Sequence, residues 1–260
     1  MSKRFSIIGD ILAEQHNGRI VPGGSGAIAL AIAALGGRVT LRSVIGTDDA
    51  GKTVLDQLKR ARIHPGLIDK VDEPTGVITR NAEGSVTNLK LGAGIKRGAL
   101  MDIYELFGHD ATVLDTFDQP LRRFISDLPA HTNGAVRMIS PLTHLDVVRP
   151  TEDELEIALR FDTIVGTPSQ LEALTGQSSP TEALADLFEM MPGAHLRSAV
   201  AITPNGLEIV SREGRVLRPI QEAVPELLVP QVVAAVAWGY ANHLDEDTVA
   251  TIAADPDAVG

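Results

Sequence analysis

Apolar residues in the first third of the chain alternate between short unbroken runs and longer helix-like segments. Residues 5–9 and 39–45 are apolar and β-branched runs that are typical of buried strands. Residues 24–35 are rich in alanine after a Gly-Gly-Ser start, and residues 52–63 repeat apolar positions at a helical spacing. This order of strand, helix, strand and helix predicts an α/β sheet.

Residues 77–91 follow a different pattern. Two β-prone segments, 77–80 and 86–89, flank the sequence Asn-Ala-Glu-Gly at residues 81–84. Turn-forming residues between two such segments predict a β-hairpin.

The rest of the chain returns to alternating strands and helices. Predicted strands lie at residues 111–114, 136–139, 163–165, 198–203, 207–210 and 216–217, and predicted helices lie at residues 152–159, 170–174, 181–191 and 230–243. Thr151 and Glu154 have the spacing of a capping box, and Pro230 suits the first position of the last helix. We expect one α/β domain over residues 1–260 with a small β appendage.

Composition places the chain among ordinary globular proteins and removes several kinds of chemistry. Of the 260 residues, 44% are hydrophobic, 22% are charged and none is cysteine. The lack of cysteine excludes disulfides, thiolate nucleophiles and cysteine-ligated metal sites. The longest apolar run, residues 27–35, is too short to span a bilayer, and residues 1–4 lead into a predicted strand without a signal-peptide pattern. We therefore expect a cytoplasmic protein without membrane association.

The charge balance narrows the range of partners. The formal net charge is −11 at pH 7, and aromatic residues make up only 3% of the chain. An acidic surface disfavours nucleic acid and anionic membranes, and few aromatic side chains are available to stack on bases. The function classes that remain are a protein that acts on a small molecule, a binding module and a component of an assembly.

A phosphate-loop pattern occurs at residues 46–53, between a predicted strand and a predicted helix. Such a loop holds phosphate with backbone N–H groups and a lysine. Asp48 and Asp49 would place two carboxylates inside the loop and repel the anion. We interpret the segment as a turn and an acidic helix start.

Metal binding is not indicated by the histidines or the acidic clusters. None of the seven histidines forms an i, i+4 pair with another, so no metal site is predicted. The acidic clusters at residues 69–73 and 152–154 are interpreted as solvent-facing surfaces.

A glycine cluster at residues 23–27 precedes an alanine-rich segment, residues 44–51 read Val-Ile-Gly-Thr-Asp-Asp-Ala-Gly, and residues 174–176 read Leu-Thr-Gly. Taken in order, these segments resemble the ribokinase-like (phosphofructokinase-B) family of sugar and nucleoside kinases. The resemblance runs from about Phe5 to Tyr240 and is most specific in the N-terminal part. Residues 23–27 and 31–37 resemble the family's glycine signature and first helix. Residues 44–51 resemble its Val-Gly-x-Asp-x-x-Gly segment. Weaker likenesses lie at residues 7–10, 74–77, 174–176 and 201–203.

The resemblance implies a three-layer α/β fold with a central, mostly parallel sheet and a small β lid from about 10–22 and 74–92. It also implies ATP-dependent phosphoryl transfer to a hydroxyl group with Mg²⁺. The residues that it assigns to substrate are Asp10, Glu14, Gly23 and Gly24. Those that it assigns to the nucleotide cofactor are Glu172 and Thr203.

The motif that supplies catalysis in this family is replaced here. The family opens its late helix with Asp-Thr-Thr-Gly-Ala-Gly-Asp, whereas this chain has Pro-Glu-Leu-Leu-Val-Pro-Gln at residues 225–231. Gln231 occupies the position of the general base, and an amide cannot accept the proton usefully at neutral pH. Pro230 replaces a glycine and has no N–H to donate to an anion. The family's substrate asparagine is also replaced, by Ala27 or Ile28.

Three hypotheses follow from this combination of family-like and replaced residues. In the first, the chain is a catalytically impaired kinase relative, or pseudokinase, that binds a small polyol, nucleoside or nucleotide or acts through assembly. In the second, the chain is an active ATP-dependent sugar or nucleoside kinase with a relocated base, for which Glu226 or Glu222 is the candidate. A separate hypothesis is a structural homodimer that forms through the hairpin at 77–91, since family members often pair through their β lids.

Overall fold

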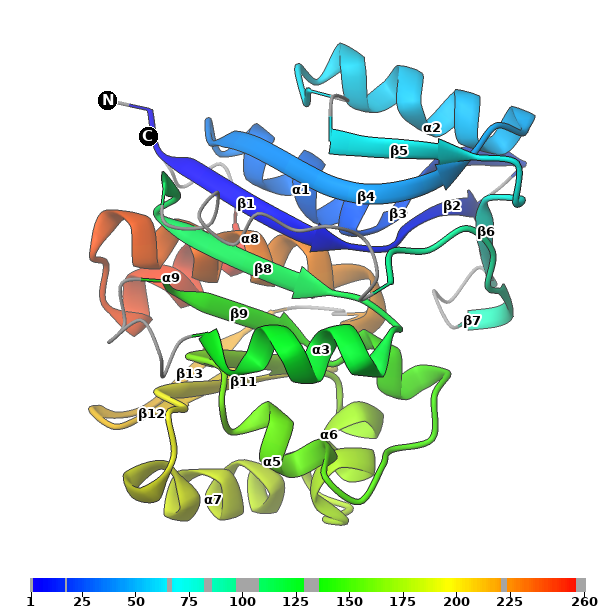
Figure 1. The fold of residues 1–260 in the computed structure, drawn as a ribbon. Helices are drawn as coiled ribbons and strands as arrows, with labels where there is room; N and C mark the ends of the chain where they lie inside the picture. Colours follow the sequence, from blue (N-terminus) through cyan, green and yellow to red (C-terminus); the bar gives the residue numbers. More distant parts are fainter. Residues whose placement is uncertain are drawn as a thin grey trace.

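The computed structural model describes residues 2–16, 18–64, 67–81, 86–96, 108–128, 136–220 and 224–255. Most of the predicted hairpin turn and Glu222 lie outside these ranges. Figure 1 shows a large twisted sheet with helices on both faces and a second, smaller sheet beside one end of it. This arrangement confirms the predicted α/β fold with a central sheet and a small β sheet.

The main sheet has the strand order β13-β12-β11-β10-β9-β8-β1-β4-β5. Strands from β11 to β5 pair in parallel, whereas β12 and β13 add as antiparallel hairpins at one edge. The strands are β1 Arg4–Gly9, β4 Arg38–Gly46, β5 Ile68–Val71, β8 Ala111–Asp115, β9 Met138–Pro141, β10 Thr163–Gly166, β11 Ser198–Thr203, β12 Gly206–Ser211 and β13 Gly214–Pro219.

The smaller sheet, here called the lid sheet, has the strand order β3-β2-β6-β7. Its strands are β2 Ile11–His16, β3 Arg19–Gly24, β6 Gly76–Arg80 and β7 Val86–Lys90. Strand β2 follows β1 after a single residue, Asp10, so the lid sheet grows directly from the carboxyl end of the main sheet. The antiparallel pairing of β6 with β7 confirms the predicted hairpin strands.

Helices cover both faces of the main sheet (Figure 1). Apolar side chains of α1, α2, α8 and α9 form one core, and those of α3, α5, α6 and α7 form the other. Of the helices described, none combines the length and apolar composition that a membrane crossing requires. The α-helices are α1 Ser25–Ala34, α2 Asp49–Arg60, α3 Gln119–Ser126, α5 Glu154–Ala158, α6 Pro168–Thr175, α7 Pro180–Met190, α8 Pro225–Asn242 and α9 Glu246–Ala254.

Helix α8 begins five residues earlier than the sequence predicts. Pro225, not Pro230, takes a first-turn position, and Pro230 lies inside the helix. Both prolines satisfy the local rule for a helix start, so packing decides between them. Val229 is buried in the core beneath the earlier turn, and the N–H groups of Leu227 and Leu228 donate to the Val224 carbonyl.

The acidic segment at residues 152–154 is not a solvent-facing surface throughout. Glu154 is buried and accepts from Arg122 Nη1 at 2.7 Å, and His144 Nε2 lies 3.1 Å from the same oxygen. The predicted capping box also fails, because Asp153 rather than Thr151 precedes α5. Buried charge needs a partner, and Arg122 supplies it from another helix.

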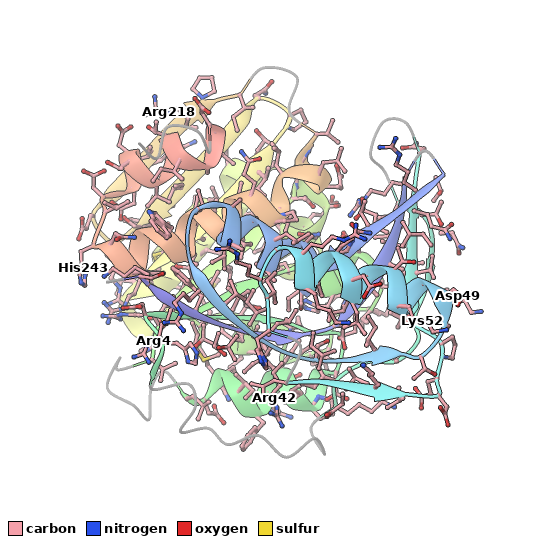
Figure 2. All side chains as sticks on the ribbon, turned by 90° about the horizontal axis from the view of Figure 1, so that it is seen from above. Arg4, Arg42, Asp49, Lys52, Arg218 and His243 are labelled. Atoms are coloured by element: carbon pink, nitrogen blue, oxygen red, sulfur yellow. The ribbon has the colours of Figure 1, made fainter. Side chains whose placement is uncertain are left out.

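The segment at residues 46–53 starts helix α2 and holds it against the lid sheet. Asp48 accepts from Gly51 N at 2.9 Å and from Thr75 Oγ1 at 2.6 Å. Lys52 pairs with Asp49 at 3.2 Å, and Figure 2 shows both side chains at the outer edge of the molecule. The carboxylates therefore cap and link elements, as a helix start requires.

Candidate functional site

A cavity of about 290 Å³ lies where the lid sheet, the carboxyl ends of β8 and β9, and the start of α8 meet. This is the place where open α/β sheets bind ligands, beyond the carboxyl ends of their strands. Its volume is at the lower end of the range for small-molecule sites. The lining residues are Leu12, Glu14, Val21, Pro22, Gly24, Ala27, Ile28, Ile78, Arg80, Val86, Leu89, Asp115, Phe117, Thr143, Asp146, Val147, Gln170, Glu226, Leu227, Val229 and Pro230.

The floor of the cavity contains Asp115, the last residue of β8. Its side chain accepts from Thr143 Oγ1 at 2.5 Å and from Ser25 Oγ at 3.3 Å. Burial, reinforced by the charge of Asp10, raises the pKa of Asp115 to about 6 although these hydroxyl groups oppose the rise. The floor therefore holds a carboxyl group that changes charge near neutral pH.

The lid sheet contributes a charged pair to the cavity. Glu14 on β2 and Arg80 on β6 form an ion pair of 3.2 Å between Oε1 and Nε, and both side chains are largely buried. Gly23 packs beside Glu14, since an added Cβ there would lie 3.1 Å from the Glu14 Cβ. Among the residues that the sequence assigns to substrate, Glu14 and Gly24 line this cavity and Gly23 supports it.

Gly24 occupies the junction between β3 and α1. Its φ of +54° is in the left-handed region, and an added Cβ would lie 2.5 Å from the Asp10 carbonyl oxygen. Only glycine fits such a position without strain. Helix α1 thereby starts at the cavity and presents Ala27 and Ile28, the two candidates for the position of the family's asparagine.

Asp10 joins three segments rather than lining this cavity. Its carboxylate accepts from Ile95 N at 2.8 Å, from Thr116 Oγ1 at 2.9 Å and from Phe117 N at 2.7 Å. Burial raises the pKa of Asp10, while these donors counteract the rise. Asp10 thus fixes the point where the chain leaves the main sheet for the lid sheet, beside a smaller cavity of about 180 Å³.

Two further carboxylates lie at the edge of the cavity nearest α8. Asp146 accepts from Gln170 Nε2 at 2.7 Å, and Glu226 lies in the first turn of α8. Burial raises the pKa of Asp146, and the negative charge of Glu226 raises it further, against the effects of Gln170 and Arg80. Asp146 and Glu226 therefore both place negative charge at this edge of the cavity.

Gln231 does not face the cavity. Its side-chain amide donates to the Ala253 carbonyl at 2.6 Å, near the end of α9. Gln231 is also six residues into α8, where a backbone N–H donates to the carbonyl four residues earlier. Neither its side chain nor its N–H is directed to a ligand beneath the lid sheet.

The two residues assigned to the cofactor lie apart from the cavity. Glu172 is exposed on α6, and neither it nor Thr203 lines the cavity described above. Thr203 closes the turn between β11 and β12 by donating to the Gly206 carbonyl at 3.0 Å and accepting from Asn205 N at 3.2 Å. Within the described part of the chain, no group of three or more His, Asp or Glu side chains is placed to hold a metal ion.

An ATP phosphate does not fit the start of α8 as it stands. Phosphate binding at a helix start requires unpaired backbone N–H groups. The N–H groups at residues 229 and 231 lie inside the helix, Pro230 has none, and the first turn carries the carboxylate of Glu226. The donors that would hold the anion are therefore paired or absent, and a like charge stands in their place.

The architecture is that of the ribokinase-like kinases. The structure matches Arabidopsis thaliana ribokinase complexed with ribose and ATP with a TM-score of 0.78 and 16% identity, covering 98% of this chain and 91% of that one. It matches Salmonella enterica aminoimidazole riboside kinase with a TM-score of 0.71 and 15% identity, covering 99% and 92%. A nucleoside kinase from Burkholderia thailandensis in complex with inosine gives a TM-score of 0.70 at 15% identity, covering 96% and 88%.

The sequence itself resembles the pfkB family carbohydrate kinases, whose family model matches residues 2–93. No curated protein matches the sequence significantly. The family signature therefore lies in β1 to β7 with α1 and α2, whereas the rest of the chain shares the fold. This confirms the resemblance that the sequence motifs indicate.

Several cavity residues were not identified from the sequence. Asp115, Thr143 and Asp146 were missed, although each follows or ends a buried strand of the parallel part of the sheet. Position at a strand's carboxyl end was the available signal. Arg80 carried no such signal, because its role depends on the pairing of β6 with β2.

Proposed function

We propose that this protein is a small-molecule binding member of the ribokinase-like fold that no longer transfers phosphate at an ordinary enzymatic rate. It takes a polyol- or nucleoside-sized ligand into the cavity beneath the lid sheet. ATP and Mg²⁺ are not used at the start of α8. The protein is thus a pseudokinase in the sense that it retains the cavity for a substrate-like ligand but not the groups that phosphoryl transfer requires at the start of α8.

The observation that carries this proposal is the early start of α8 at Pro225. Continuous helix through residues 225–231 uses the N–H groups that an anion would need, and Gln231 bonds to Ala253. A general base contributes typically ~10²–10⁴-fold and one anion-hole donor ~10²–10³-fold, so the combined loss spans several orders of magnitude. The cavity beneath the lid sheet, by contrast, remains open and lined by charged side chains.

The test is an ADP-release assay with ATP, Mg²⁺ and a panel of sugars and nucleosides. We expect turnover far below ~1 s⁻¹, the lower limit of ordinary enzyme rates, with every panel member. Thermal unfolding with the same panel measures binding, because a ligand that binds only the native state raises the midpoint. Turnover at or above that rate would overturn the proposal, and an unchanged midpoint with every compound would remove its binding part.

The alternative function is an active sugar or nucleoside kinase whose base is Glu226. The observation that favours it is the position of this carboxylate in the cavity wall, at the start of α8. If this alternative holds, the wild-type chain releases ADP in the panel and E226Q loses ~100-fold or more of that rate. The control E189Q removes an exposed carboxylate from α7 and should leave the rate unchanged.

Assembly through the lid sheet is a further part of the proposal. Strands β3 and β7 are the edges of this sheet, and the side chains of β7 are mostly exposed. An unpaired strand edge can extend a sheet into a second copy. Light scattering tests whether the protein forms a homodimer. A mass near twice 27.6 kDa supports the homodimer, and a monomer mass at all concentrations contradicts it.

A further inference from the structure

Asp115 combines deep burial with a position on the cavity floor. It ends β8, an interior strand of the main sheet, and it lines the cavity although only 4% of the residue is exposed. A buried carboxylate needs hydrogen-bond donors from the protein or from a ligand, because bulk water does not reach it. The donors around Asp115 therefore decide which ligand group the floor can accept.

The two side-chain oxygens of Asp115 are not equally supplied with donors. Oδ1 accepts from Thr143 Oγ1 at 2.5 Å. Among the described residues, Oδ2 has only Ser25 Oγ as a donor, at 3.3 Å. The same Ser25 hydroxyl lies closer, at 3.0 Å, to the backbone carbonyl oxygen of Asp115. A hydroxyl group has one proton, so when Ser25 donates to the carbonyl, Oδ2 is left without a donor.

A proton on Asp115 removes this deficit. In the neutral acid, the Oδ2 hydroxyl donates to Ser25 Oγ, Ser25 donates to the carbonyl and Thr143 donates to Oδ1, so each oxygen has a partner. Burial, reinforced by the charge of Asp10, raises the pKa of Asp115 to about 6. Above this pH, the floor of the cavity carries an acceptor that needs a donor from a ligand.

The neighbouring acid, Asp10, is held in its charged form by different partners. The Asp10 N–H donates to the Asp115 carbonyl at 2.9 Å, so the two residues are adjacent. The Asp10 carboxylate accepts from Ile95 N at 2.8 Å and from Phe117 N at 2.7 Å. A backbone N–H can only donate, whereas the hydroxyl groups beside Asp115 can also accept a proton-bearing partner. Asp115 is therefore the acid of this pair that gains and loses a proton.

The cation behind the floor does not supply the missing donor. Arg122 on α3 lowers the pKa of Asp115 through its charge, but its Nη1 donates to Glu154 at 2.7 Å. His144 Nε2 lies 3.1 Å from the same Glu154 oxygen, and burial lowers the pKa of His144 to about 4, so it is neutral at pH 6. The other ionisable groups on the surrounding elements are Asp146 on the 3₁₀ helix η3 (Thr143–Asp146), Glu226 on α8, and the paired Glu14 and Arg80 on the lid sheet.

We propose that Asp115 recognises a hydroxyl group of the ligand, which donates to its Oδ2, and that binding releases the Asp115 proton to solvent. This inference rests on the proposed binding function and deepens it by naming the group that selects the ligand. The ligand hydroxyl supplies the donor that Ser25 gives to the carbonyl, so it stabilises the carboxylate over the neutral acid. A neutral hydroxyl also costs less to bury on this floor than a charged group.

Calorimetry in two buffers that differ in ionisation enthalpy measures the released proton directly. The probes are inosine and D-ribose, and the tighter binder of the two should release about half a proton at pH 6 and almost none at pH 8. Its affinity should rise about tenfold from pH 5 to pH 8, because only the carboxylate form accepts the hydroxyl. Proton uptake, or no proton exchange at pH 6, would overturn the inference.

Analogues that lack one hydroxyl identify the group that donates to Asp115. They are 2-deoxy-D-ribose and the 2′-, 3′- and 5′-deoxy forms of inosine. At least one analogue of the binding probe should bind about tenfold more weakly at pH 8 and release no proton at pH 6, because it lacks the donor. Full proton release by every analogue would contradict recognition through a hydroxyl group.

The substitution D115N assigns the released proton to this residue. Its amide N–H takes the place of the acid O–H, so the variant should bind the probe about tenfold more weakly at pH 8 and release no proton at pH 6. The control E189Q removes an exposed carboxylate of α7, outside the cavity, and should keep the wild-type release. Proton release that persists in folded D115N would overturn the inference, and the wild-type calorimetry remains decisive if the variant does not fold.

Failure of this inference is distinguishable from failure of the proposed function. Binding of inosine or D-ribose without proton release refutes the role of Asp115 and keeps a binding cavity. Absence of binding by both probes overturns this inference, while the wider sugar and nucleoside panel still tests the binding proposal. ADP release at an ordinary rate overturns the non-catalytic function whatever Asp115 does.

Discussion

Restoring the family's acidic residue at position 231 should damage the protein without restoring phosphoryl transfer. In the wild type, Gln231 Nε2 donates to the Ala253 carbonyl at 2.6 Å. That carbonyl belongs to the last turn of α9, where carbonyl groups lack partners within the helix. The substitution Q231D removes the donor and places a negative charge at the negative end of the α9 dipole.

The expected loss of stability can be worked out from these two contacts. Loss of the hydrogen bond costs ~1 kcal/mol. An unfavourable charge at a helix end adds ~0.3–1 kcal/mol. The free energy of unfolding should therefore fall by ~1.3–2 kcal/mol in Q231D and by ~1 kcal/mol in Q231M, which loses the donor without gaining charge.

Urea unfolding measures these differences, and the ADP-release panel measures catalysis in the same preparations. We expect Q231D to be less stable than Q231M, Q231M less stable than the wild type, and none of the three to turn over at ~1 s⁻¹. Sugar-dependent ADP release by Q231D would show that residue 231 does reach a substrate. Unchanged stability in both variants would show that the contact with Ala253 is unimportant.

Three other predictions concern the junctions around the cavity. G24A places a Cβ 2.5 Å from the Asp10 carbonyl oxygen at a φ of +54°. It should therefore lower the free energy of unfolding by ~1–2 kcal/mol or more in urea titrations, and wild-type stability would refute the steric argument. Burial raises the pKa of Asp115 from 3.8 to about 6, so its contribution to stability is greatest below pH ~4 and is lost as the pH rises through 6, by up to ~3 kcal/mol. D115N should therefore be more stable than the wild type at pH 8 and lose this dependence, and an equal slope between pH 4.5 and 8 would contradict the assignment. R122A leaves buried Glu154 without its cation and should lower the free energy of unfolding by ~3–5 kcal/mol in the same titrations. R123A removes an exposed partner of Asp153 and should lower it by ~1 kcal/mol at most. Equal losses in the two variants would refute the role of burial.

The central strands of the main sheet could be predicted well because their signal is local, whereas the edge strand β5 was not predicted. The buried runs that end at Gly9 and Asp115 need only a short window of sequence to be recognised, since both faces of a central parallel strand are covered. The predicted boundaries of β1, β4 and β8 accordingly differ from the observed ones by only a residue or so.

Features that depend on distant partners were missed. Glu154 resembles part of an exposed acidic run, yet Arg122 approaches it from 32 residues away in the sequence. The start of α8 was misplaced because Pro225 and Pro230 satisfy the same local rule, and only burial of Val229 distinguishes them. Arg80 reaches Glu14 through strand pairing that no short window of sequence reveals.

Because α8 starts at Pro225, recovery of a phosphate cradle would require more than one point mutation. Pro230 lies five positions after Pro225, which corresponds to ~7.5 Å of helix that would have to unwind. Unwinding would expose Val229 and leave Pro230 still unable to donate. Under the proposed function, a way back to phosphoryl transfer would therefore pass through several individually unfavourable substitutions.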